Sequence, residues 1–181
     1  MKTLVVYKSK TGYVENYAKW ISQDLKCDLK KIDDVDTDLL IQYDTIVYGG
    51  GLYAVGINGI DLIKSNYDTL SNKNIIVFMS GASPYREDII DEIVEQNFTE
   101  NQKSKIKFFY LRGGFNYYKL NLKDKLLMRL LQLKLKSKSI LKIKLTPDER
   151  GMLSAYSKPI DFTRKEKIRP IIEYLKILNL S

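Results

Sequence analysis

Short apolar runs alternate along the chain with longer segments in which apolar residues recur every three or four positions. The runs are rich in β-branched and aromatic residues and predict strands at Thr3–Tyr7, Asp28–Ile32, Thr45–Tyr48, Asn74–Met79 and Ile106–Leu111. The segments between and after them predict helices at Val14–Leu25, Ile60–Leu70, Arg86–Phe98 and Thr163–Leu178. This alternation is typical of an α/β fold, in which helices cover both faces of a parallel sheet.

In the third of these helices the spacing also predicts which side chains face the core. The inward residues are expected to be Ile89, Ile90, Ile93 and Val94.

The alternation breaks down between the fifth strand and the last helix. Leu120–Lys134 predicts a helix in which leucines share one face, namely Leu122, Leu126, Leu127, Leu130 and Leu131. From Leu133 to Leu145 lysines and apolar residues tend to alternate, so a strand, a helix end and irregular structure all stay open. Residues 146–151 are expected to be a turn-rich break. We expect one domain over residues 1–181, with a basic, leucine-rich insertion at 113–157.

Charge is divided unevenly between the two parts of the chain. The 181 residues carry a net charge of +8, but residues 1–100 hold 10 basic and 16 acidic residues. Residues 119–145 hold nine basic residues and one acidic residue, Asp124. A basic stretch of this kind predicts an anionic partner, or else a solvated face without a partner.

Two absences in the composition limit the chemistry. The chain has no histidine, which excludes Ser-His-Asp and Cys-His catalysis and histidine-ligated metals. Cys27 is the single cysteine, so it forms neither an internal disulfide nor a thiolate zinc site. We therefore expect no metal, identify no catalytic side chain, and expect a bound cofactor to carry the chemistry.

Small residues follow each strand that is able to contribute to a site. They occur at Ser9-Lys10-Thr11-Gly12, Gly49-Gly50-Gly51, Ser80-Gly81-Ala82 and Arg112-Gly113-Gly114. Ligands of open parallel sheets bind outside the carboxyl ends of the strands, so these four segments are expected to meet around one ligand. The first lies between a buried strand and a helix start, where amide hydrogens and the helix dipole favour a phosphate. No Walker A sequence occurs, which removes the main support for an ATPase or GTPase.

The first ten residues of this pattern resemble the flavodoxin signature. Thr3–Gly12 is similar to a hydrophobic strand that runs into S/T-x-T-G-x-T, the loop that binds the phosphate of FMN in flavodoxins. Val14 stands where the signature has its last hydroxyl residue, so one phosphate donor is missing. The resemblance implies a flavodoxin-like three-layer sandwich with a five-stranded parallel sheet in the order 2-1-3-4-5. It also implies FMN as the cofactor.

Within that family the chain resembles the flavodoxin-like, quinone-dependent protoporphyrinogen oxidases more than the small electron carriers. The similarity rests on Gly49–Tyr53, on residues 113–118, on the basic insertion and on Asp161–Thr163, which opens the last helix. It implies an FMN-dependent oxidoreductase that passes electrons from a reduced tetrapyrrole to a quinone. The alternative is an electron-transfer flavodoxin, or a flavodoxin-like reductase, without a substrate pocket of its own.

The resemblance assigns residues to the cofactor. The phosphate is expected at Ser9, Lys10, Thr11, Gly12, Tyr13 and Val14. The isoalloxazine ring is expected beside Gly50, Gly51, Leu52, Tyr53, Ser80, Gly81, Ala82, Tyr85, Gly113, Gly114, Phe115 and Tyr117. The aromatic members of this set are candidates to lie against the ring face.

The partners follow from charge and from the resemblance. We expect a quinone or a redox partner protein, and no nucleic acid; a homodimer stays open. The expected location is the cytoplasm, with peripheral contact at the inner face of the cell membrane. Residues 119–145 would make that contact with anionic lipid. A third alternative is a basic interaction module, binding lipid or nucleic acid through the same residues, whose flavin site is empty.

Overall fold

Five parallel strands form the central sheet of the protein. The computed structural model describes residues 1–53 and 56–179. The strands are, in spatial order, β2 (Asp28–Lys31), β1 (Thr3–Lys8), β3 (Thr45–Tyr53), β5 (Asn74–Gly81) and β6 (Ile106–Arg112). A short strand, β4 (Gly56–Ile57), pairs antiparallel with the end of β3. The α/β class and the strand order expected from the sequence are confirmed.

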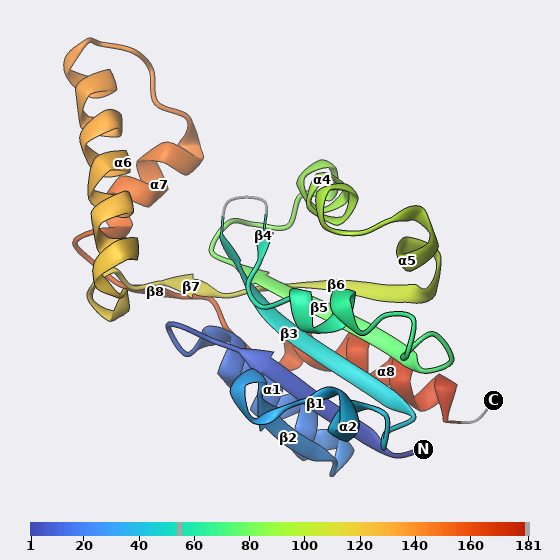
Figure 1. Cartoon of the computed structure of the whole chain (residues 1–181). Coiled ribbons are helices and arrows are strands. Elements are labelled where there is room, and N and C mark those ends of the chain that lie inside the picture. Colours follow the sequence, from blue (N-terminus) through green and yellow to red (C-terminus); the bar gives the residue numbers. More distant parts are fainter. Residues whose placement is uncertain (54–55, 180–181) are drawn as a thin grey trace.

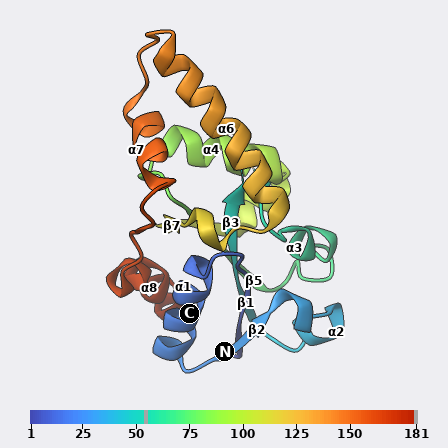
Figure 2. The same cartoon turned by 90° about the vertical axis from the view of Figure 1, so that its left-hand side faces the viewer.

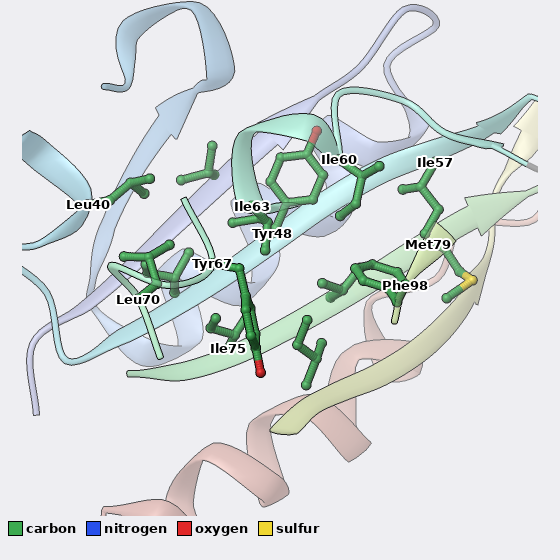
Figure 3. Close-up of a cluster of buried hydrophobic side chains, with 14 of the residues drawn as sticks. Leu40, Tyr48, Ile57, Ile60, Ile63, Tyr67, Leu70, Ile75, Met79 and Phe98 are labelled. Carbon is green, nitrogen blue, oxygen red and sulfur yellow. The ribbon is translucent and has the colours of Figure 1, made fainter. Parts of the chain in front are cut away.

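Helices cover both faces of this sheet (Figure 1). On one face, α1 (Tyr13–Leu25) and α8 (Arg169–Leu178) pack on the apolar side chains of β1, β3 and β5. The other face is covered by α2 (Thr37–Leu40), α3 (Asp61–Ser65) and α4 (Glu87–Asn97). Figure 3 shows the core on that side, where Tyr48 and Met79 of the sheet meet Leu40, Ile63 and Phe98. A further helix, α5 (Glu100–Lys105), precedes β6. With both faces covered, the strands are apolar along most of their length.

The third strand is longer than the sequence indicated. Gly49, Gly50 and Gly51 were expected to form a loop, but they lie within β3 and pair with β5. A Cβ atom at Gly49 would overlap the ring of Phe78, and one at Gly50 would lie 2.8 Å from the Asn58 carbonyl oxygen. The first two glycines therefore allow close packing inside the sheet.

Three helix predictions need correction. The helix expected at Ile60–Leu70 ends at Ser65, because the Asn66 side chain donates to the Leu62 carbonyl and turns follow. Ile89 is exposed, since the core-facing side of α4 is formed by the buried Ile93 and the partly buried Ile90 and Val94. The last helix begins at Arg169, six residues later than expected, with Pro170 in its first turn, where a missing N–H costs least.

Residues 116–159, named the arm here, project from the sheet between two short strands. β7 (Gly114–Phe115) and β8 (Ile160–Asp161) pair antiparallel at its base. Its two helices, α6 (Leu122–Ile140) and α7 (Pro147–Ala155), lie side by side (Figures 1 and 2). α6 extends six residues beyond the expected Lys134, which settles the ambiguity over the start of residues 133–145 in favour of helix.

The expected turn-rich break at residues 146–151 is wrong, because α7 begins there. Thr146 accepts from the Glu149 backbone N–H, and the Glu149 side chain accepts from the Thr146 N–H. This reciprocal capping box and Pro147 in the first turn start a helix rather than end one.

Membrane-spanning helices were sought over the described residues. None of the helices in residues 1–53 and 56–179 is both long and apolar enough to cross a bilayer.

Candidate functional site

A cavity of about 650 Å³ lies where the carboxyl ends of β1, β3 and β5 face the arm. Residues of the sheet edge and its loops line one side: Ser9, Lys10, Thr11, Tyr13, Val14, Gly51, Leu52, Tyr53, Ser80, Gly81, Ala82, Gly114 and Phe115. Residues of the arm line the other: Asn116, Leu120, Asp124, Leu127, Met128, Leu131 and Met152. This is the position at which open parallel sheets bind their ligands.

The loop between β1 and α1 presents an open helix N-terminus to the cavity. Gly12 has φ of 95°, a left-handed conformation that favours glycine, and its N–H donates to the Ser9 hydroxyl oxygen at 3.1 Å. No side chain caps α1, so its first-turn amides keep their hydrogen-bonding capacity. Together with the positive end of the helix dipole, they form a site suited to a phosphate.

Lys10, expected to supply charge to a phosphate, is held by the arm instead. Its Nζ lies 2.7 Å from Oδ2 of Asp124 in the first turn of α6 and 4.1 Å from the centre of the Tyr53 ring. Partial burial of Tyr53 and the nearby Asp124 carboxylate raise the pKa of Tyr53 to about 12, so its hydroxyl stays protonated even at moderately alkaline pH. This ion pair joins the arm to the loop that follows β1.

Ser80, at the end of β5, leaves a hydrogen-bonding group unused. Its side chain is 6% exposed, and its hydroxyl oxygen has no hydrogen-bond partner among the described residues. Side chains alternate along β5, and Ile76 and Phe78 face α1, so Ser80 faces the same side as the phosphate-suited loop. A buried polar group without a partner costs free energy, which a polar ligand in the cavity would recover.

Gly113 lies against that hydroxyl, and the neighbouring Gly114 lies against Tyr13. A Cβ atom on Gly113 would lie 2.5 Å from the Ser80 hydroxyl oxygen, and one on Gly114 would lie 2.8 Å from the Tyr13 ring. Tyr13 in turn donates from its hydroxyl to the Ile160 carbonyl at 3.1 Å, which ties α1 to the base of the arm. Glycine at these two positions therefore keeps the wall of the cavity open and the arm in place.

The four candidate ring-stacking aromatics are divided by the structure. Tyr53 and Phe115 line the cavity. Tyr85 is exposed beside Tyr110, and Tyr117 packs between Tyr118 and Tyr156 within the arm.

Most residues predicted to hold the cofactor surround this cavity, and their role in binding stays a prediction. Five of the predicted residues do not line it: Gly12, Gly50, Tyr85, Gly113 and Tyr117. The arm's contribution was not predicted, because leucine spacing predicts a helix without showing where the helix lies. The T-x-x-E pattern from Thr146 to Glu149 is typical of a helix start and could have predicted α7, whose Met152 lines the cavity.

The chain is similar to flavodoxin domains. A family model described as a flavodoxin domain matches residues 4–140. An uncharacterized protein of Methanocaldococcus jannaschii is 30% identical over 118 residues, which cover 64% of this chain and 73% of the relative.

Solved structures with a similar fold include a flavodoxin and a Trp repressor binding protein. A flavodoxin from the domain Archaea is 21% identical with a TM-score of 0.39, over 62% of this chain and 85% of that one. The Trp repressor binding protein from Bacillus subtilis is 18% identical with a TM-score of 0.46, over 64% and 85%.

Proposed function

Because the chain belongs to the flavodoxin-domain family, we propose that it is an FMN-dependent oxidoreductase. The observation that carries the proposal is the buried, partnerless hydroxyl of Ser80 in the wall of a cavity that also contains an uncapped helix N-terminus. An anionic ligand with further hydrogen-bonding groups would satisfy both features.

Each part of the cavity wall has a role in this proposal. The first-turn amides of α1 and the hydroxyls of Ser9 and Thr11 hold the phosphate. Gly51–Tyr53 and residues 80–82 flank the ring, and Ser80 donates to or accepts from a polar group of the cofactor. FMN, when bound, supplies electron transfer that the side chains of this chain do not provide.

The finer proposal is a protoporphyrinogen oxidase-type enzyme, which takes electrons from a reduced tetrapyrrole and passes them to a quinone. Its support is the apolar wall that the arm adds to the cavity, formed by Leu127, Met128, Leu131 and Met152. Planar, largely apolar redox substrates fit such a wall. In this proposal the chain is one flavodoxin-like domain with residues 113–157 as its insertion. Tyrosines, carboxylates and water move protons, since the chain has no histidine.

Two measurements, made one after the other, test this function. The purified protein is titrated with FMN, and the flavin-loaded protein is then assayed anaerobically for protoporphyrinogen oxidation with a menaquinone analogue. The proposal predicts flavin binding followed by turnover. Binding without turnover would favour the electron-transfer flavodoxin, and absence of binding would refute both.

A matched pair of variants tests the role of the arm in turnover. Met128 lines the cavity, whereas Leu126 lies on the same helix and is exposed outside it. We expect Met128→Lys to reduce turnover at least about tenfold, because a charge enters an apolar wall. Leu126→Lys in the same assay is expected to leave turnover unchanged. Equal effects of the two would contradict a substrate site under the arm.

A further inference from the structure

α6 carries two apolar faces, and only one of them is covered. The inner face packs towards α7: Leu135 is buried, and the Tyr156 hydroxyl donates to the Met128 carbonyl at 2.5 Å. The outer face carries exposed residues at spacings of four, four, three and seven: Leu122 (85% exposed), Leu126 (63%), Leu130 (56%), Leu133 (56%) and Ile140 (80%). At 3.6 residues per turn these five form one stripe along the helix, here called the outer stripe. The leucines expected to share one face are thus divided, since Leu127 and Leu131 line the cavity.

Basic side chains border the outer stripe on both sides. The helical spacing places Arg129 and Lys136 along one edge and Lys123 and Lys134 along the other. None of these four has an ion-pair partner in the part of the chain that the structure describes. Long basic side chains beside an apolar stripe are able to extend their charges away from it while their stems stay in apolar surroundings.

We propose that the outer stripe of α6 binds an anionic lipid surface. The leucines enter the boundary between headgroups and acyl chains, and the flanking cations pair with lipid phosphates. A single exposed leucine is ordinary, but a continuous stripe on an uncovered helix face marks an interaction surface.

Charge selects lipid over a second copy of the chain. Two outer stripes packed together would bring two sets of basic side chains close to each other, and this repulsion opposes pairing. An anionic bilayer instead offers an apolar interior to the leucines and negative headgroups to the basic side chains. The arm projects from the end of the sheet, so the sheet does not block contact with such a surface (Figure 1).

The test is co-sedimentation of the full chain with vesicles, which requires no flavin. We expect binding to phosphatidylcholine–phosphatidylglycerol vesicles, loss of that binding at high salt, and little binding to phosphatidylcholine alone. A stripe variant carries Leu126→Gln, Leu130→Gln and Leu133→Gln, and a charge variant carries Lys123→Gln, Lys134→Gln and Lys136→Gln. Each is expected to bind the anionic vesicles at least about tenfold more weakly than the native chain.

A control variant separates local charge from net charge. Lys30→Gln, Lys64→Gln and Lys105→Gln lower the net charge by the same amount at exposed sites outside the arm, and binding is expected to stay native. Circular dichroism checks that each variant folds. Equal binding by the native chain and the stripe variant, or by the charge and control variants, would overturn the proposal. So would stripe-dependent dimers, seen by analytical ultracentrifugation, without vesicle binding.

Discussion

At the scale of single residues, two kinds of side chain define the candidate site. One has a hydrogen-bonding group without a partner, and the other forms an ion pair with a residue far away in the sequence. Ser80 was predictable, since it follows a buried strand in a run of small residues. The contact of Lys10 with Asp124 was not, because 114 positions separate them and local patterns do not encode how the arm docks. Local sequence therefore indicated the sheet side of the cavity and not the arm side.

Replacing Ser80 by alanine is expected to have opposite effects on the free and the flavin-bound protein. Without ligand, the change removes a buried hydroxyl without a partner, so the free energy of unfolding is expected to rise by about 1 kcal/mol. With FMN, it removes a hydrogen bond, so the dissociation constant is expected to increase about fivefold. Thermal unfolding and flavin fluorescence titration measure the two effects.

Ser22→Ala is the control for this change. Ser22 is also buried, but its hydroxyl donates to the Lys19 carbonyl at 3.1 Å, away from the cavity. FMN affinity is expected to stay native in that variant. If Ser80→Ala destabilises the flavin-free protein and leaves FMN affinity unchanged, Ser80 has no role in binding.

Asp124→Asn is expected to strengthen the binding of FMN and to leave that of riboflavin unchanged. The change removes a carboxylate from the cavity wall and releases Lys10 to interact with a phosphate. A gain of about 1 kcal/mol for one partly exposed charge pair corresponds to about fivefold in affinity, and it should shrink at high salt. Titrations of both flavins at two salt concentrations test this, with Asp88→Asn on α4 as the control. An equal gain for riboflavin would show that the phosphate is not involved.

Tyr48 gives a prediction for the pH dependence of stability. It is fully buried, its hydroxyl donates to the Asn58 carbonyl at 2.6 Å, and burial together with the Asp61 carboxylate raises its pKa. Above pH about 10 the unfolded tyrosine loses its proton and the folded one keeps it, so stability falls as pH rises. Below that pH, the protonated Tyr48 hydroxyl makes its full contribution to the free energy of unfolding.

Tyr48→Phe isolates this contribution. The variant is expected to be about 1 kcal/mol less stable at neutral pH, because it loses the hydrogen bond to Asn58. Above pH about 10 the native protein should lose up to about 1.4 kcal/mol per pH unit more than the variant, so the difference narrows. Urea unfolding over a pH series measures both. Parallel curves at alkaline pH would contradict the raised pKa.

At the scale of elements, the sequence predicted the sheet better than the helices around it. Strands of this sheet are covered on both faces, so their apolar runs are nearly continuous and easy to recognise. The end of β3 was misjudged because Gly49 and Gly50 allow close packing against Phe78 on β5 and Asn58 after β4, and a local sequence pattern does not show such contacts. α7 was missed because proline and acidic residues, read as turn signals, here form the start of a capped helix.

Two glycine substitutions in and below the arm are expected to act in opposite directions. An alanine at Gly151 in α7 meets nothing within 4 Å, so Gly151→Ala should stabilise the helix by about 1 kcal/mol. An alanine at Gly114 would clash with the Ile160 carbonyl and the Tyr13 ring, so Gly114→Ala should open the β7–β8 pair. Hydrogen exchange across residues 116–159 should slow in the first variant and accelerate in the second. Native exchange in Gly114→Ala would mean that β7–β8 does not hold the arm.

At the scale of the whole molecule, a body without net charge and a basic arm share one cavity. The body supplies the helix N-terminus and the Ser80 hydroxyl, and the arm supplies apolar residues and Asp124. The net charge of +8 lies on the arm, which holds 11 basic and 3 acidic residues, whereas the rest of the chain holds 19 of each. The residues that line the cavity differ from those of the outer stripe, for which lipid contact is proposed. Substitutions can therefore alter ligand binding or lipid binding separately.

The most direct test of flavin binding in the cavity is a titration of the flavin-free protein with FMN, in which flavin fluorescence and visible absorbance are recorded. We predict quenching that saturates at one FMN per chain, with weaker binding by Ser80→Ala and native binding by Ser22→Ala. A protein that is colourless as purified and quenches no added FMN would contradict the assignment of the cavity to a flavin.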